Sequence, residues 1–402
     1  MNNKERPPRI CLLTACYPDY AEGKLGKFSH YAYRGHFIKK LVKQYANHHR
    51  DVFVVTPKIY QDSPSRENYP YEHIHRFPFC SENKLLNEYK RIPLLRMITY
   101  MLSGLYSCMR IVRENHCHLI HAHFVLPTGV IGVIVGILLK KPVIVTAHGT
   151  DINILPEKYY LMRILVKWVL KKANRIVCVA EHIADRVMEF GITREKIIIL
   201  PMGIDDHWIT QKLPQKTMDV PVISTRNLGT IYNIPLLLKC IPHLAKRKPK
   251  ICVTIAGEGP QKQDIMKMAD DLRLGKHVKF IGRVDNDEMP NYLSQAKVYV
   301  STSFTDGSSV SLLEAMVSGA FPVVSDIHAN REWITDGLNG FLVPLDDEKY
   351  LADKILEALD NPRLRERAKK MNHKTVKERA LWSDNIDKMI QIDEYVMHAF
   401  YP

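Results

Sequence analysis

The sequence alternates strand-like and helix-like segments almost from end to end, in two successive series. Runs of buried-type residues such as Ile10–Ala15 and Val52–Thr56 are typical of strands, and apolar residues at helical spacing follow them. Because parallel strands need long crossover connections, this alternation predicts parallel sheets covered by helices. A polar, irregular segment at 206–221 separates the two series. At 402 residues the chain also exceeds the usual size of one hydrophobic core, so we expect two α/β domains.

The expected domains are an N-terminal one from residue 1 to 205 and a C-terminal one from 206 to 384. A last helix at 385–402 is expected to pack back toward the first domain. Two such units place the carboxyl ends of their strands at a cleft, which is where ligands of these folds bind.

The excess of positive over negative charge is confined to the first half of the chain. Residues 1–200 hold 30 Lys and Arg against 16 Asp and Glu, whereas residues 201–402 hold 27 of each. This asymmetry indicates an anionic partner of the first domain, either nucleic acid or the anionic face of a membrane. A basic face that is simply solvated is the alternative.

One basic segment, residues 85–115, has the pattern of one or two amphipathic helices interrupted near Pro93. Its apolar side is expected to pack into the core, with a bilayer surface as the less favoured interpretation. The residues assigned to that apolar side are Leu95, Ile98, Met101, Leu102, Leu105 and Met109.

Cysteine spacing and the chain start favour a reduced, cytosolic protein. The eight cysteines form no CxxC pair, which argues against a zinc site or a disulfide framework. The polar start of the chain has no signal-peptide pattern. The longest apolar run, 124–139, is short and contains a proline and glycines, so we expect a core helix and not a membrane span.

The segment Ser301–Ser325 predicts a strand end, a small-residue turn, a helix at 310–318 and a second buried strand. The first N–H groups of a helix that follows such a turn form an anion site. Asp306 lies in the turn and Glu314 lies in the helix, so their carboxylates suit the two ends of a ligand with phosphates in its middle. An ordinary turn with an Asp near a helix start is the plain alternative.

Further candidate residues follow other predicted strands. Arg226 follows the first strand of the second half, and a cation there suits a diphosphate. The turn at 257–259 (Gly-Glu-Gly) permits a close backbone approach, and Arg283 follows another strand. His148 follows a strand of the first half. A surface arginine and a buried structural histidine are the alternatives for Arg226 and His148.

Taken together, these motifs resemble the retaining family-4 glycosyltransferases of the GT-B fold, which consist of two Rossmann-like domains. Asp306 and Glu314, separated by seven residues and followed by AMVSGAFPVV, are similar to the E-x7-E signature of that family. The remaining matching stretches, in the same order as in the family, are the glycine loop near Gly26, HGTD at 148–151, LPMGID at 200–205, GEGP at 257–260 and the segment 330–340.

The resemblance implies a role for each matching residue. Glu314 would bind the ribose of a nucleotide sugar, and Asp306 would contact sugar hydroxyls near the reacting carbon. Arg226 would stabilise the leaving phosphate, and His148 would lie beside the transferred sugar. The other implied substrate-binding residues are Gly26 over the phosphates, Ser309 and Val310 at the diphosphate, Gly257, Glu258 and Arg283 at the base, and Asp151, Asn233, Gly259, Gly307 and Ser308.

The chain departs from the family pattern at three places. Asp306 replaces a glutamate, and Ser308-Ser309 replaces a Phe-Gly pair. The lysine expected shortly after Arg226 is missing from the segment 228–233, so one cation of the phosphate site is absent there. We expect Lys24 or Lys27 to substitute for it.

The function implied by this resemblance is retaining transfer of a sugar from a UDP- or GDP-linked donor, without a metal or other cofactor. The acceptor would be a hydroxyl of a lipid-linked or polysaccharide molecule in lipopolysaccharide or capsule synthesis. The enzyme would be cytoplasmic and peripheral on the inner face of the cell membrane. The alternatives are an epimerase or phosphorylase of the same fold, an inactive scaffold, and a nucleic-acid binder. Nucleic acid is disfavoured because the basic residues are dispersed and no stacking motif is evident.

Overall fold

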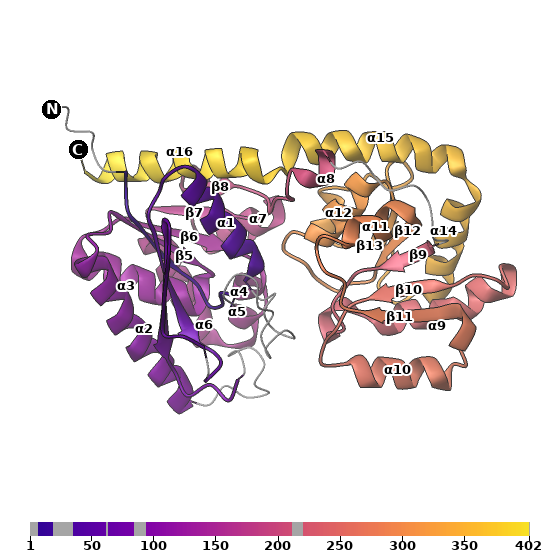
Figure 1. Cartoon of the computed structure of the whole chain (residues 1–402), viewed down its shortest axis with the longest axis horizontal. Coiled ribbons are helices and arrows are strands. Elements are labelled where there is room, and N and C mark those ends of the chain that lie inside the picture. Colours follow the sequence, from indigo (N-terminus) through magenta and orange to yellow (C-terminus); the bar gives the residue numbers. More distant parts are fainter. Residues whose placement is uncertain (1–6, 19–34, 62, 84–93, 211–219, 402) are drawn as a thin grey trace. The chain divides into compact units, whose positions relative to one another are not determined.

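The computed structural model describes residues 7–18, 35–61, 63–83, 94–210 and 220–401. The chain forms two compact units (Figure 1). Unit 1 comprises Met1–Leu200 and Ile386–Pro402, and unit 2 comprises Pro201–Asn385. The boundary thus follows residue 200, where the sequence suggested 205, and the end of the chain belongs to unit 1.

Unit 1 is built on an eight-stranded sheet with the strand order β3-β4-β2-β1-β5-β6-β7-β8. Every neighbouring pair is parallel except β3 and β4, which form an antiparallel pair at one edge that the sequence analysis did not predict. The strands are β1 (Ile10–Leu13), β2 (Val52–Lys58), β3 (Arg66–Tyr69), β4 (Glu72–Pro78), β5 (Leu119–His123), β6 (Val143–Ala147), β7 (Arg175–Cys178) and β8 (Ile197–Ile199).

Helices connect these strands in the order that the alternating pattern predicts. Strands β1, β5 and β6 are buried along their whole length, as expected for a sheet covered on both faces. The helical segments are α1 (His36–Asn47), α2 (Leu94–Glu114), η2 (Val125–Gly129), α3 (Val130–Leu139), α4 (Thr150–Asn153), α5 (Leu155–Lys158), α6 (Tyr160–Lys172), α7 (Glu181–Glu189), η3 (Arg194–Lys196) and most of α16 (Trp382–Phe400).

Helix α2 does not pack by the face that the sequence analysis assigned to the core. Leu95, Ile98 and Leu102 are exposed, whereas the buried side carries Tyr100 and Cys108. The helix is apolar on more than one side, so its periodicity alone did not identify the side that meets the sheet. The prediction of core packing for those three residues is therefore wrong.

Unit 2 is built on a six-stranded parallel sheet with the order β11-β10-β9-β12-β13-β14. The strands are β9 (Val220–Ser224), β10 (Val253–Ala256), β11 (Val278–Gly282), β12 (Ala296–Ser301), β13 (Phe321–Ser325) and β14 (Phe341–Val343). The helical segments are α8 (His207–Thr210), η4 (Thr230–Tyr232), α9 (Ile234–Arg247), α10 (Lys262–Asp271), η5 (Gly275–His277), α11 (Met289–Gln295), α12 (Val310–Ser318), α13 (His328–Arg331), α14 (Glu348–Asp360) and α15 (Pro362–Arg379).

The two parallel sheets confirm the predicted class of two Rossmann-like α/β domains. One detail of unit 2 differs from expectation. The predicted linker at 206–221 contains α8 and the start of β9, and its middle lies outside the described residues. The matching segment 330–340 begins in the short helix α13 and continues as a loop after Arg331.

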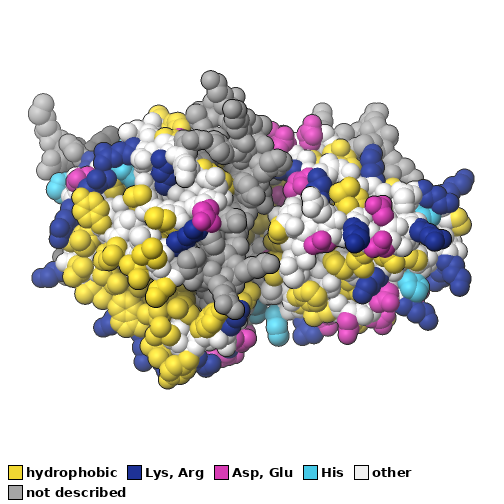
Figure 2. Space-filling view, turned by 90° about the horizontal axis from the view of Figure 1, so that it is seen from below, with side chains coloured by type: hydrophobic (Ala, Val, Ile, Leu, Met, Phe, Trp, Pro, Cys, Tyr) yellow, Lys and Arg dark blue, Asp and Glu magenta, His cyan; other side chains and the backbone are white. Residues whose placement is uncertain are grey.

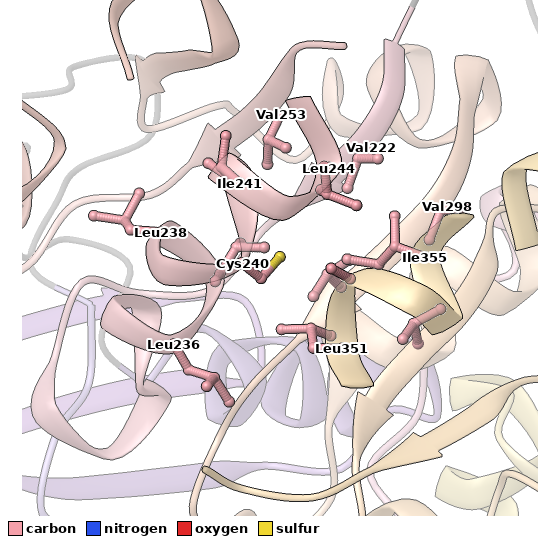
Figure 3. Close-up of a cluster of buried hydrophobic side chains, with 14 of the residues drawn as sticks. Val222, Leu236, Leu238, Cys240, Ile241, Leu244, Val253, Val298, Leu351 and Ile355 are labelled. Atoms are coloured by element: carbon pink, nitrogen blue, oxygen red, sulfur yellow. The ribbon is translucent and has the colours of Figure 1, made fainter. Parts of the chain in front are cut away.

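The core of unit 2 lies on both faces of its sheet, since neighbouring residues of a strand point to opposite faces. Val222 of β9 packs in the cluster formed with α9 and α14, which Figure 3 shows. Ile223, the next residue, packs in the cluster that contains Tyr299 and the buried side of α12. This second cluster fixes α12 against the sheet and thereby positions its N-terminus.

The C-terminal helix α16 is held to α1 by a buried polar contact within unit 1. The Tyr45 hydroxyl donates to Asp393 Oδ2 at 2.6 Å, and Arg50 pairs with Glu394 beside it. Burial raises the pKa of Asp393 from 3.8 to about 7, although the Tyr45 hydrogen bond and Arg50 oppose that shift. Ionised Asp393 is therefore disfavoured in the folded state.

This contact predicts a pH-dependent effect of Asp393→Asn. The folded pKa lies above the unfolded one, so the native carboxyl loses stabilisation as the pH rises from about 4 to about 7. Asparagine does not titrate and still accepts from Tyr45. The unfolding free energy of the variant relative to the native protein should therefore increase by more than about 1 kcal/mol between pH 5 and pH 8.

Denaturant unfolding at the two pH values measures this difference. Asp384→Asn, at an exposed position in the first turn of the same helix, is the control, and its relative unfolding free energy should change by only a few tenths of 1 kcal/mol between the two pH values. A flat or reversed dependence for Asp393→Asn would contradict the assignment.

Candidate functional site

The centre of the candidate site in unit 2 is the side chain of Arg226, just beyond the end of β9. It is buried, with 7% of its surface exposed. Its Nη2 donates to Asp306 Oδ2 at 2.5 Å. Its Nη1 donates to the hydroxyl oxygens of Ser309 at 2.8 Å and Ser311 at 2.6 Å. We call these four residues the Arg226 cluster.

Helix α12 places two members of this cluster. Ser309 caps the helix by accepting the Leu312 N–H at 3.3 Å, which is the role that serine takes at helix starts. Ser311 lies in the first turn, and its hydroxyl is 3.0 Å from the hydroxyl of Tyr299 in β12. The positive end of the helix dipole therefore lies at the same place as the Arg226 guanidinium.

An aromatic ring covers the guanidinium. The Tyr232 ring centroid is 4.6 Å from Arg226 Cζ, a distance at which a cation and a ring attract. Tyr232 belongs to the segment 228–233, where the family pattern has a lysine. The substitutes that we expected, Lys24 and Lys27, lie outside the described residues.

The ion pair with Asp306 keeps the buried arginine charged. Burial alone would lower the pKa of Arg226, but the Asp306 carboxylate, together with Tyr299 and Tyr232, raises it above its ordinary value. Removing one partner of a buried pair costs about 3–5 kcal/mol, because the other charge remains unpaired. The cluster is therefore a fixed structural unit.

Among the described residues, Asp306 accepts two hydrogen bonds. Its Oδ2 accepts from Arg226, and its Oδ1 accepts the Gly307 N–H at 3.0 Å. Each carboxylate oxygen accepts more than one hydrogen bond, so the group keeps capacity for a ligand hydroxyl. The expected contact of Asp306 with a sugar stays a prediction.

The glycines of the turn after β10 lie against the backbone that follows Arg226. A Cβ at Gly257 would overlap the carbonyl oxygen of Arg226, and one at Gly259 would overlap Leu228. The Leu228 N–H also donates to the Glu258 carbonyl oxygen at 3.0 Å. Glycine at 257 and 259 is thus needed for the packing of two adjacent strand ends.

The other predicted residues of unit 2 lie after the carboxyl ends of its strands or in the helices that follow them. Glu314 is partly buried in α12, one turn beyond Val310, with which the helix begins. Arg283 is exposed just after β11. The hydroxyl oxygen of Ser308 is buried and finds no partner among the described residues. Asn233 adopts a left-handed conformation (φ 47°) at the start of α9, and its Nδ2 donates to the Leu345 carbonyl at 3.1 Å.

Unit 1 carries a separate cluster of histidines. His148 Nε2 is 3.2 Å from His123 Nδ1, and the ring of His121 stacks on that of His123. Burial lowers the pKa of His121 and His148 to about 3 and that of His123 well below 6.5. The three rings are therefore neutral at physiological pH, and His148 is suited to hydrogen bonding more than to holding a charge.

Asp151 holds the backbone beside this cluster. Its carboxylate accepts the N–H groups of Val125 at 2.6 Å, His148 at 3.1 Å and Gly149 at 2.9 Å. Burial raises the pKa of Asp151 to about 6, although these hydrogen bonds oppose the shift. Asp151 thus positions the His148 loop, and its predicted contact with substrate stays a prediction. Gly26 lies outside the described residues.

Several residues of both clusters were missed by the sequence analysis. They are Ser311, Tyr232 and Tyr299 around Arg226, and His121 and His123 beside His148. Only the histidines carried a sequence signal, because the two side chains of a His-x-His pair in a strand lie on the same face of the sheet. Tyr299 and Ser311 had none, since their segments are far from Arg226 in the chain, and nothing in the nearby segment 228–233 marked the Tyr232 ring as a partner of the guanidinium.

Within the described ranges, His, Cys, Asp and Glu form no group of three or more that could hold a metal ion. None of the described helices combines the length and the hydropathy that are needed to span a bilayer.

Comparison with known proteins identifies two matching families. The family described as Glycosyltransferase Family 4 matches residues 35–208, and the one described as Glycosyl transferases group 1 matches residues 207–375. Alpha-monoglucosyldiacylglycerol synthase of Streptococcus pneumoniae is 24% identical over 319 residues, which cover 70% of each chain. UDP-Gal:alpha-D-GlcNAc-diphosphoundecaprenol alpha-1,3-galactosyltransferase of Escherichia coli is 22% identical over 296 residues, 68% of this chain and 75% of that protein.

The fold is also that of a solved structure. Sucrose-phosphate synthase of Thermosynechococcus elongatus superposes with a TM-score of 0.77 at 17% identity, covering 98% of this chain and 100% of the other. At this identity the likeness shows the shared fold alone.

The packing of the turn after β10 predicts that Gly257→Ala destabilises unit 2. Its Cβ would overlap the carbonyl oxygen of Arg226, so the backbone of the Arg226 segment must move, at a cost of about 1–3 kcal/mol. Thermal unfolding measures the loss. Gly275→Ala is the control, because a Cβ there meets nothing within 4 Å and its melting temperature should not fall. Equal melting temperatures for the two variants would refute the close approach at residue 257.

Proposed function

Because the chain belongs to the family-4 glycosyltransferases and has the GT-B fold, we propose that it moves a sugar from a nucleotide sugar to an acceptor hydroxyl with retention of anomeric configuration. The observation that carries this proposal is the Arg226 cluster, a buried and permanently charged guanidinium at the N-terminus of α12. A fixed cation and a helix N-terminus together suit a diphosphate, the group that leaves in such a transfer.

The donor would lie along the ends of the strands of unit 2. The first N–H groups of α12, at Val310 and Ser311, would donate to phosphate oxygens, since the first turn of a helix has no internal acceptors for them. The buried Ser308 hydroxyl is a further candidate donor. Glu314, one turn further along α12, would accept from ribose hydroxyls. The base, of UDP or GDP, would lie near Glu258 and Arg283.

The proposed chemistry follows from these charges. As the bond to the diphosphate breaks, negative charge grows on the leaving oxygen, where Arg226 and the α12 dipole stabilise it. Positive charge grows at the anomeric carbon, and the acceptor hydroxyl attacks from the face that the diphosphate leaves, passing its proton to the departing phosphate oxygen. Asp306 would orient the sugar. Because Arg226 and the α12 dipole already supply positive charge at the leaving oxygen, we propose no role for a metal ion.

The proposed acceptor is a lipid-linked or polysaccharide molecule in cell-surface glycan synthesis, for example of lipopolysaccharide or capsule. Two relatives support a lipid-linked acceptor, since one is named for a diacylglycerol glycolipid and the other for a sugar on diphosphoundecaprenol. The excess of 14 positive charges in residues 1–200 suits an anionic membrane surface. The proposed location is therefore cytoplasmic and peripheral, on the inner face of the cell membrane.

Glu314→Gln is the first test of this function. Loss of the ribose-binding carboxylate should lower the release of nucleoside diphosphate from the preferred UDP- or GDP-sugar by about a hundredfold or more. The matched control is Glu366→Gln at an exposed position of α15, which should leave the rate unchanged. An unaffected rate in Glu314→Gln would refute the site.

The native rate should also persist in EDTA, and the product should keep the anomeric configuration of the donor.

Asp306→Asn separates the two roles of that residue. The substitution removes a negative charge beside the proposed diphosphate and weakens the sugar contact. We therefore expect kcat to fall about ten- to a hundredfold while the KM for the donor stays equal or falls. Steady-state kinetics measure both, and Asp353→Asn, which breaks an exposed pair with Arg247, is the control. A raised donor KM with an unchanged kcat would show that Asp306 acts only by holding Arg226.

A further inference from the structure

Unit 1 has a broad apolar surface formed by helices that lie side by side. Helix α3 packs against both α2 and α6. Figure 2 shows a wide apolar area on unit 1. The exposed large apolar residues of these three helices, which we call the α2–α6 face, are Leu94, Leu95, Ile98, Leu102 and Tyr106 of α2, Ile137 and Leu138 of α3, and Tyr160, Leu161 and Ile164 of α6.

The fold does not require this surface. The sheet-facing sides of the helices are already filled, by Tyr100 and Cys108 in α2 and by Val166 in α6. Leu94 nevertheless exposes 75% of its surface and Tyr160 exposes 80%. Soluble monomers rarely expose contiguous apolar patches beyond a few hundred Å², and larger ones mark contacts with a partner or a membrane.

The same three helices are strongly cationic. Between them they carry seven Lys and Arg residues and one acidic residue, Glu114. The exposed cations include Arg113, Arg163, Lys167 and Lys171. Apolar side chains beside lysine and arginine are the pattern of helices that lie in the interface of a membrane.

We propose that the α2–α6 face is a docking surface for a bilayer that contains anionic lipids. The leucines, isoleucines and tyrosines enter the boundary between headgroups and acyl chains, and the cations contact lipid phosphates. Tyr106 and Tyr160 suit this depth, because the amphipathic ring of tyrosine favours the membrane–water interface. The inference rests on the proposed function, since it names the surface by which the enzyme reaches a membrane-bound acceptor.

Charge favours a lipid surface over a second copy of the chain. Of the seven cations, Arg96 pairs with Glu82 and Arg110 pairs with Glu114. Two copies joined through this face would bring together two sets of the exposed ones, Arg113, Arg163, Lys167 and Lys171. Such like charges repel one another. Anionic headgroups instead attract the cations, and each cation raises the affinity for the membrane about fivefold.

Sedimentation with vesicles tests the proposal. The native protein should bind vesicles of phosphatidylglycerol and phosphatidylcholine and bind pure phosphatidylcholine weakly. Leu95→Gln/Leu102→Gln changes two exposed positions two turns apart on one side of α2, and it should lower binding by about tenfold or more. Arg163→Gln/Lys167→Gln should lower binding to the anionic vesicles by about fivefold per charge. Met266→Gln/Met371→Gln, at exposed helical positions of unit 2, is the matched control and should bind like the native protein.

Each outcome decides the question. Absence of binding to anionic vesicles, or binding that the leucine variant retains, overturns the proposal. A native dimer in light scattering that the leucine variant dissociates overturns it in favour of a second copy. Nucleoside diphosphate release without vesicles tests the proposed transferase separately: docking that fails while release persists refutes only the surface. Absence of release with intact docking refutes only the transferase.

Discussion

The buried ion pair between Arg226 and Asp306 organises the candidate site of unit 2. A guanidinium that is removed from water needs a compensating charge and acceptors for its N–H groups. The Asp306 carboxylate and the hydroxyls of Ser309 and Ser311 meet this need. Since Asp306, Ser309 and Ser311 belong to the turn after β12 and to the start of α12, the arginine ties that segment to the end of β9.

The geometry of the parallel sheet makes this arrangement possible. β9 and β12 are neighbouring parallel strands, so their carboxyl ends lie at one edge of the sheet. Glycines after β10 let a third strand end lie against the backbone of Arg226. The packing of Tyr299 and the buried side of α12 holds the helix at the angle that brings its N-terminus to the guanidinium. The site is thus a product of the core beneath it.

Unit 1 combines a neutral buried cluster with a cationic, apolar exterior. Its three stacked histidines are uncharged because burial lowers their pKa values. Its charge lies instead on exposed helices that also present leucine, isoleucine and tyrosine. This distribution supports our proposal that unit 2 binds the donor and that unit 1 meets the membrane and the acceptor.

The sequence by itself determined the two α/β units, most strand positions, the strand–turn–helix around Asp306 and Glu314, and the strand-end positions of Arg226 and His148. These features depend on periodicity and on turn residues within one short segment, which a single sequence displays. Only the tertiary structure decided that Asp306 and Ser311 bind Arg226, and that His123 lies against His148. It also decided which side of α2 faces solvent, since that helix is apolar on two sides. Packing between segments that are distant in the chain determines these partners, and the local sequence pattern does not reveal that packing.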